Sequence, residues 1–469
     1  MNERNGLFVA QHQRPDHGAD AARRREKERR NVMTRILLLS LVLAAAAPAQ
    51  PVGASQNAPA APWPVTVSSE PFKSIGSRGY LASVLNLLDR EAEALASERL
   101  KVLYLDILGT RLAMVGEHER ATRRGDEAYP RQHESATRGV TEALLKSYRP
   151  VSALEAIIEA AHGRRLVMVN EEHRSTIQRA FSNRLLVPLR QLGFTYLAVE
   201  TIHEDTATLN ERGYPVLETG TYTDDPAFGD LIRRAIGLGY TVLAYEPSRK
   251  VSAPRPEDTS PVDAMNRRER GQARNIFERT FQKDPDARVL VVSGRDHIAE
   301  NTGGRWTPMG GILKELSGID PVTFDLFGMV EHSRRELEHW AFRTVDDAAW
   351  LADEPVVLVD DKGGLWSRNP DGLDASVFHP RTTYVHGRPH WMSMGGLRSP
   401  HVMDCPGYDE PVLLQALFAG ESVHAVPLDQ TVWWPDRPKP ALLLRPGAYR
   451  VRVIDRSGRA LHRVEVRID

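Results

Sequence analysis

The chain contains almost no cysteine and carries almost no net charge. The 469 residues contain one cysteine, Cys405, so no disulfide can form within the chain. We expect Cys405 to be a buried, unreactive thiol, as most free cysteines are. The 61 Lys and Arg residues are balanced by 62 Asp and Glu residues. Because nucleic-acid binders normally carry a basic excess, we expect no nucleic-acid partner.

Several catalytic signatures are also missing. The sequence has no G-x-S-x-G nucleophile elbow, no H-E-x-x-H metal motif, no Walker loop and no G-x-G-x-x-G after a predicted strand. These absences argue against the enzyme classes that depend on those motifs. No apolar run after residue 50 is long enough to span a bilayer, so we expect no transmembrane segment in the mature chain.

The first 60 residues have the pattern of a signal peptide followed by a flexible lead-in. A positively charged flank that ends at Arg35 precedes an apolar run over residues 36–47, and residues 47–49 fit an A-x-A cleavage site. The run is about a dozen residues long, which suits a signal peptide better than a membrane-spanning helix. We therefore expect an exported protein, periplasmic or secreted, whose true start is Met33.

The hydrophobic pattern predicts an α/β fold. Residues 75–160 show mostly helical spacing, and from residue 164 short apolar runs alternate with amphipathic helical stretches. This alternation predicts a mostly parallel sheet flanked by helices. The predicted strands cover residues 165–170, 196–200, 241–246, 288–294, 322–327, 356–360 and 376–379.

The chain divides into three predicted parts. Residues 1–60 are the signal peptide and lead-in, and residues 61–400 are an α/β domain with a helical N-terminal region. Residues 401–469 are a small antiparallel β module, in which residues 449–454 and 461–468 form a hairpin.

Glutamate or histidine follows four of the predicted strands. Glu171 and His173 follow the first strand, Glu200 ends the second, Glu246 ends the third and His297 follows the fourth. The carboxyl ends of parallel strands share one edge, which is where open α/β sheets bind ligands. Carboxylates beside imidazoles can act as an acid and a base, or can hold a divalent metal that activates water.

These motifs resemble a superfamily that contains the erythromycin esterases, the ChaN-type haem-binding proteins and the Tiki-type metalloproteases. The resemblance covers about residues 150–330, and Asn170 stands where the family usually has glycine. It rests on Glu171-x-His173, on Glu200, on Arg268-Glu269-x-x-Gln272-Ala273-x-Asn275, and on Ser293-Gly294-x-x-His297.

The resemblance implies a hydrolase of the esterase or peptidase type that acts on a small molecule or a peptide. The expected catalytic residues are Glu171, His173, Glu200 and His297. The expected substrate-binding residues are Glu246, Arg268 and Asn275. In a metal-dependent version, a divalent metal would be held by Glu171, His173 and His297.

Other interpretations stay open. A haem- or iron-binding protein of the ChaN type is the main alternative, and a former enzyme kept as an interaction module is another, suggested by Asn170. Arg268 can also be a solvated charge, because Arg267, Glu269 and Arg270 surround it. Further histidines that can bind metal or haem, or lie exposed in loops, are His332, His339, His379, His386, His390 and His401. Packing is expected for Trp391, Trp433 and Trp434, although aromatic pairs can also bind sugars.

Overall fold

A computed structural model describes residues 79–97, 100–130, 136–248, 251, 253, 255–301 and 304–469. The signal peptide and lead-in expected for residues 1–60 lie outside these described residues. None of the helices in the described part combines the length and the apolar character that crossing a bilayer requires.

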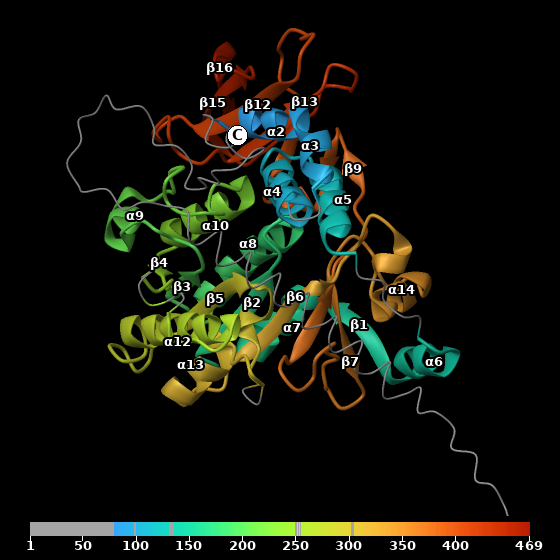
Figure 1. Cartoon of the computed structure of the whole chain (residues 1–469), viewed down its shortest axis with the longest axis vertical. Coiled ribbons are helices and arrows are strands. Elements are labelled where there is room, and N and C mark those ends of the chain that lie inside the picture. Colours follow the sequence, from blue (N-terminus) through green and yellow to red (C-terminus); the bar gives the residue numbers. More distant parts are fainter. Residues whose placement is uncertain are drawn as a thin grey trace, which may run out of the picture.

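An eight-stranded sheet forms the centre of the molecule (Figure 1), with the strand order β1-β7-β8-β6-β2-β5-β3-β4. Pairing is parallel from β8 across to β4, whereas β7 pairs antiparallel with both of its neighbours. This confirms the predicted mostly parallel sheet. The strands are β1 (Tyr148–Ser152), β2 (Leu166–Glu171), β3 (Tyr196–Val199), β4 (Thr241–Ala244), β5 (Val289–Gly294), β6 (Val322–Met329), β7 (Val356–Asp360) and β8 (Ala375–Phe378).

Helices cover both faces of this sheet because alternate strand residues point to opposite sides. In β2, Val167 and Val169 pack into the core formed with α7, α8 and α10, whereas Leu166 and Met168 pack into the core formed with α12 and α13. These helices are α7 (Ala153–Ala161), α8 (Thr176–Gln191), α10 (Pro226–Gly237), α12 (Pro261–Arg279) and α13 (Met309–Ser317). The apolar strands predicted from the sequence are therefore buried on both faces.

The region before the sheet is mostly helical, as its spacing predicts. It comprises α2 (Tyr80–Asp89), α3 (Glu91–Leu95), α4 (Lys101–Met114), α5 (His118–Ala128) and α6 (Arg138–Ser147). The exception is β1, which the sequence analysis did not identify as a strand. It lies at the edge of the sheet, where Pro150 is tolerated because an edge residue can do without a backbone donor.

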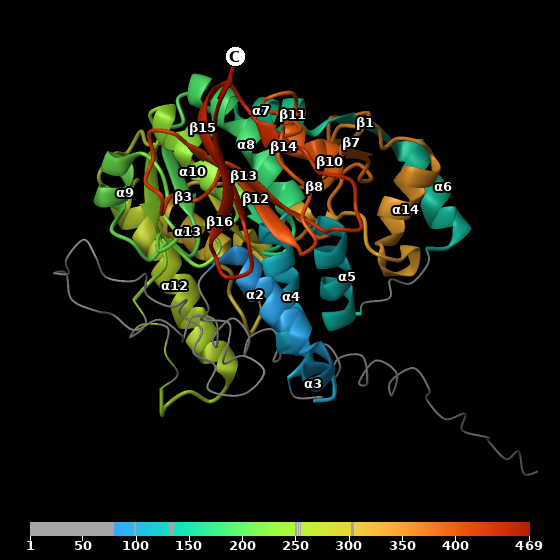
Figure 2. The same cartoon turned by 90° about the horizontal axis from the view of Figure 1, so that it is seen from above.

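Two peripheral helices lie at opposite ends of the sheet. Figures 1 and 2 show α14 (Trp340–Asp347) beside α6 at the end that carries β1 and β7, and α9 (Thr206–Arg212) at the end that carries β4. Both helices are short, and each closes a connection between the strands on either side of it in sequence.

The carboxyl-terminal region forms the predicted β module. A four-stranded antiparallel sheet has the order β13-β12-β15-β16, and the expected hairpin is β15 and β16. Cys405 is a buried free thiol in the core of this module, as expected. The strands of the region are β9 (Tyr384–Val385), β10 (Arg388–Pro389), β11 (Ser399–His401), β12 (Val412–Phe418), β13 (Asp429–Trp433), β14 (Leu442–Leu444), β15 (Gly447–Ile454) and β16 (Ala460–Ile468).

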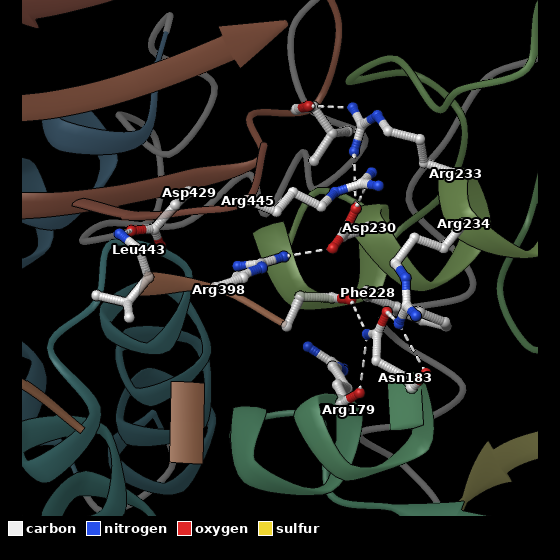
Figure 3. A network of polar contacts seen from close by, with 12 residues as sticks. Arg179, Asn183, Phe228, Asp230, Arg233, Arg234, Arg398, Asp429, Leu443 and Arg445 are labelled. Atoms are coloured by element: carbon white, nitrogen blue, oxygen red, sulfur yellow. Dashed lines mark hydrogen bonds and ion pairs between the residues drawn. The ribbon is translucent and has the colours of Figure 1, made fainter. Parts of the chain in front are cut away.

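A buried ion-pair network fastens this module to the α/β layer (Figure 3). Asp230 of α10 accepts hydrogen bonds from Arg398 at 2.7 Å and from Arg445 at 3.0 Å. Asp230 and Arg398 are both completely buried. Because burying a charge is costly unless it is paired, the module and α10 depend on each other.

Candidate active site

The carboxyl ends of four neighbouring strands meet at one edge of the sheet. Strands β2, β5, β3 and β4 stand side by side in that order and run parallel. Glu171 is the last residue of β2, Gly294 is the last of β5, and Glu200 directly follows β3. His173 follows β2, and His297 lies in the short helix η2 (Arg295–Ile298) that follows β5. The residues predicted from the sequence therefore come from the ends of these strands, and from the segments that follow them, at one shared edge.

His173 is held on one side and open on the other. Its Nδ1 atom lies 3.1 Å from Oε1 of Glu171, and its ring stacks on Tyr222 with centroids 3.8 Å apart. The opposite edge of the ring faces Gly294, because a Cβ atom at that position would lie 3.3 Å from Nε2 of His173 and 3.0 Å from Oε2 of Glu200. A side chain at position 294 would therefore crowd both His173 and Glu200.

A buried arginine keeps Glu171 ionised. Arg179, which is completely buried, donates from Nη2 to Oε1 of Glu171 at 2.8 Å and from Nε to Oε2. Its Nη1 atom lies 3.2 Å from Asp225, which caps the start of α10. Burial on its own raises the pKa of Glu171, but Arg179 and His173 outweigh burial and the net pKa is lowered. Glu171 therefore presents a carboxylate to the imidazole of His173.

Glu200 occupies the centre of the cluster. Its Oε2 atom accepts a hydrogen bond from the backbone N–H of Gly294 at 2.6 Å, and its Oε1 atom accepts one from Nη2 of Arg268 at 2.5 Å. Burial raises the pKa of Glu200, yet the interactions with His297 and Arg268 outweigh burial and hold the pKa well below its usual range. Glu200 is therefore a carboxylate under all ordinary conditions.

His297 has its own acidic partner. Its Nδ1 atom lies 2.7 Å from Oε1 of Glu269, a fully buried residue that also accepts a hydrogen bond from the backbone N–H of Met309 at 2.8 Å. Its Nε2 atom lies 3.8 Å from Oε1 of Glu200. Burial lowers the pKa of His297, but Glu269 and Glu200 outweigh burial and the net pKa is raised. Nη1 of Arg268 lies 3.2 Å from the same Nε2 atom, and because a guanidinium can only donate, this contact requires a lone pair on Nε2.

Arg268 links the residues that follow β3 and β4. Its guanidinium donates to Glu246 at 2.6 and 2.9 Å as well as to Glu200, and Gln272 also donates to Glu246 at 2.9 Å. Asn275 donates instead to the backbone carbonyl of Tyr245 at 2.9 Å. Of the three residues expected to bind substrate, Glu246 and Arg268 thus lie in the cluster, and Asn275 supports the end of β4.

Asn170 links β2 to β6 and to the segment that follows β5. Its side-chain amide donates to the carbonyl of Arg295 at 2.7 Å and to Asp325 at 2.8 Å, and accepts from the N–H of Leu326 at 2.6 Å. Asn170 is completely buried. The Asn170 side chain therefore has a structural role, because its amide joins β2 to the neighbouring segments.

The expected metal ligands do not form a recognisable metal site. Within the described ranges, no group of three or more His, Cys, Asp and Glu side chains is arranged to hold a metal ion. Among the other histidines, His332 pairs with Asp126 at 2.6 Å, and His339 caps α14 by accepting from Ala341. His379 is completely buried.

Sequence reasoning missed two buried charged residues that complete the site. Glu269 lies on the same helical face of α12 as the buried residues Ala273 and Ile276. Arg179 lies seven residues before Leu186, and both are buried in α8. A charge within an apolar helical stripe is a detectable signal of a buried ion pair. The alternative that Arg268 is a solvated charge is therefore wrong, because Arg268 pairs with Glu200 and Glu246. Its neighbour Glu269 is fully buried as well. The tyrosine that stacks on His173 had no sequence signal, because it comes from an irregular loop.

Comparisons with known proteins give weak matches only. No protein-family model and no curated protein matches the chain. Solved structures that it resembles include RRSP, a MARTX toxin effector domain from Vibrio vulnificus CMCP6 (15% identity, TM-score 0.27, covering 45% of this chain and 43% of that one). A second structure, described as a bacterial protein toxin, has 11% identity and a TM-score of 0.28, and the match covers 45% of each chain.

The type III effector HopBA1 matches at 16% identity with a TM-score of 0.27, over 41% of this chain and 94% of that one. This chain aligns with less than half the length of RRSP and of the second structure. Similarity at this level assigns neither a family nor an activity to this chain, and the superfamily resemblance stays a prediction.

Proposed function

We propose that this protein is a hydrolase of the esterase or peptidase type, with His173 as its general base. The observation that carries the proposal is the hydrogen bond between Nδ1 of His173 and the ionised carboxylate of Glu171. A carboxylate accepts only, so Nδ1 carries a proton, and in the neutral ring the lone pair therefore lies on Nε2. Nε2 lies beside Gly294, at the edge of the sheet where a substrate would bind.

Hydrolysis would then proceed through water. Nε2 of His173 accepts a proton from water as the water oxygen attacks the carbonyl carbon of an ester or amide. The positive charge of Arg268 stabilises the oxyanion that forms, while Glu200 and Glu246 hold the guanidinium in place. When the carbon–oxygen or carbon–nitrogen bond breaks, His173 returns its proton to the leaving group and is neutral again.

A metal-free reaction suits this arrangement better than a metal-dependent one. Both oxygens of Glu171 already accept hydrogen bonds from Arg179, and Oε1 also contacts His173. A metal would have to displace these cationic partners. We further propose that the chain is exported, on the evidence of its amino-terminal sequence.

The experiment is a hydrolysis screen of the full chain against panels of chromogenic esters and fluorogenic peptides. His173→Ala should lose at least about 100-fold in kcat/KM, the usual scale for a general base, and the matched variant His424→Ala, in an exposed loop, should keep it. Circular dichroism would check that both variants fold. Equal activity of His173→Ala and wild type would contradict the proposal.

Two further arms separate the alternatives. Treatment with EDTA should leave the activity unchanged, and loss of activity that zinc restores would favour the metal-dependent version. Titration with haemin should give no saturable Soret shift. A shift that His173→Ala abolishes would support the haem-binding alternative and contradict catalysis by a free imidazole.

A further inference from the structure

Arg174, the residue directly after His173, has no part in the proposed chemistry and yet is firmly held. Its side chain is only 9% exposed and pairs through Nη1 with Asp106 of α4. Its guanidinium carbon lies 5.2 Å from the ring centre of Tyr129, which directly follows α5. Arg174 thus reaches from the segment after β2 to the amino-terminal helices.

Two glycines make room for this arginine. A Cβ atom at Gly109 of α4 would lie 2.8 Å from Cδ of Arg174, and one at Gly125 of α5 would lie 2.8 Å from its Nε. Helices α4 and α5 pack side by side (Figure 1), so the two glycines form a notch for the arginine. A methyl group at either position would displace the side chain of Arg174.

A tight turn couples Arg174 to His173. The backbone N–H of Ser175 donates to the carbonyl of Glu172 at 2.7 Å. His173 and Arg174 are therefore the two central residues of a four-residue turn. Because they share the peptide between them, the backbone of His173 cannot reorient without moving Arg174.

Glu172 extends the same anchor to the second histidine of the site. Its Oε1 atom lies 3.1 Å from Nη2 of Arg174, and its Oε2 atom lies 2.6 Å from Nη2 of Arg295. Arg295 begins the short helix that contains His297, and its guanidinium carbon lies 5.5 Å from the ring centre of Tyr129. One carboxylate and one tyrosine therefore fasten both histidine-bearing segments to the amino-terminal helices.

We infer that Arg174 is a positioning residue, which sits in the notch of Gly109 and Gly125 and keeps Nδ1 of His173 against Glu171. Arg179 fixes Glu171 independently of the turn, so a loosened turn would move the imidazole away from a stationary carboxylate. The inference rests on the proposed role of His173 in hydrolysis. It assigns a function at the site to the amino-terminal helices.

The test compares Gly125→Ala with Gly139→Ala in the full chain. Each variant adds a methyl group to a helical glycine, but a Cβ atom at Gly139 of α6 meets nothing within 4 Å. In Gly125→Ala the new methyl group meets the end of a flexible side chain, so the helices should stay folded. Gly125→Ala should lower kcat by about 10- to 100-fold, the cost of misplacing a catalytic group, with KM near the wild-type value. Gly139→Ala should match wild type.

Nitrogen-15 NMR of the histidines separates positioning from a general loss of stability and needs no turnover. The His173 signal should change toward a mixture of tautomers in Gly125→Ala, whereas destabilisation alone would leave the signal of the folded protein unchanged. A His173 signal that is the same in Gly125→Ala and Gly139→Ala would overturn the inference. A changed signal in a protein that hydrolyses none of the substrates would support positioning and contradict only the hydrolase proposal.

A second pair of variants keeps the test open if Gly125→Ala does not fold. Arg174→Lys keeps the charge but lacks the planar fork that pairs with both Asp106 and Glu172. Its kcat should therefore lie between those of wild type and Arg174→Met, with the same order in the change of the His173 signal. Wild-type kcat and an unchanged signal in Arg174→Met would also overturn the inference.

Discussion

At the scale of single residues, two buried carboxylates orient the two imidazoles of the site. Glu171 holds Nδ1 of His173, and Glu269 holds Nδ1 of His297. Nε2 of His297 lies 3.8 Å from Oε1 of Glu200, and a side chain at position 294 would meet both Nε2 of His173 and Oε2 of Glu200. The two rings differ in their neighbours, because Nη1 of Arg268 lies 3.2 Å from Nε2 of His297, whereas the ring of His173 stacks on Tyr222.

Removing the charge of Glu171 should destabilise the protein. Arg179 is fully buried, and in Glu171→Gln it would lose its main counter-charge. Breaking one side of a buried ion pair costs about 3–5 kcal/mol, so we expect the free energy of unfolding to fall by roughly that amount. Urea denaturation would measure it, with Glu155→Gln on the exposed surface of α7 as the control. Equal losses in both variants would contradict the role given to Glu171.

The raised pKa of His297 predicts a pH dependence of stability. A group whose pKa is higher in the folded than in the unfolded state stabilises the fold fully at low pH. That contribution is lost as the pH rises from about 6.5, the unperturbed value, through the folded pKa. The free energy of unfolding of wild type should therefore decline over this range.

The comparison variant for this pH dependence is His297→Gln, which cannot titrate and should show a flatter profile above pH 6.5. Urea denaturation across a series of buffers would give both profiles. On the acidic side, the lowered pKa values of Glu171 and Glu200 predict a loss of stability as the pH falls below their usual range in both proteins. Parallel profiles of the two proteins above pH 6.5 would contradict the assignment.

At the scale of elements, the site depends on how the strand ends are joined. Asn170 connects the end of β2 to β6 and to the loop after β5. In Asn170→Gly, these hydrogen bonds are lost and the strand gains backbone freedom. We expect a loss of about 1–3 kcal/mol in the free energy of unfolding and reduced turnover. Urea denaturation and the hydrolysis screen would measure both, and a variant as stable and as active as wild type would show that the amide is dispensable.

Much of this element level was predictable from the sequence. The apolar runs of β2, β3 and β5 and the amphipathic α8 and α12 carry clear periodicities, and the parallel arrangement places Glu171, Glu200 and His297 at one edge. The edge strand β1 was not predicted, because Pro150 and the flanking helical pattern conceal it. Tyr222 was not predictable either, since its contact with His173 depends on the path of an irregular loop.

At the scale of the whole molecule, the β module is part of the structure that supports α10. Asp230 of α10 pairs with Arg398 and Arg445 (Figure 3), and Asp225 at the start of the same helix pairs with Arg179 of the site. The module and the site are therefore linked through one helix.

Asp230→Asn tests this link, because it leaves the buried Arg398 without a full counter-charge. We expect a loss of about 3–5 kcal/mol in the free energy of unfolding and earlier cleavage by trypsin within residues 401–469. Limited proteolysis with mass spectrometry would locate the first cuts. The exposed variant Asp436→Asn serves as the control, and identical cleavage of the two variants would show that the module is held by other contacts.

The central claim is that Glu171 fixes the tautomer of His173 and leaves Nε2 free to accept a proton. Nitrogen-15 NMR of histidine-labelled protein reports this tautomer directly and needs no substrate, with the His173 signal assigned from its absence in His173→Gln. For the neutral ring, the account predicts a proton on Nδ1 and none on Nε2 in the wild-type protein, and a mixture of tautomers in Glu171→Gln. A proton on Nε2 in the wild-type protein, or a signal unchanged by Glu171→Gln, would contradict it.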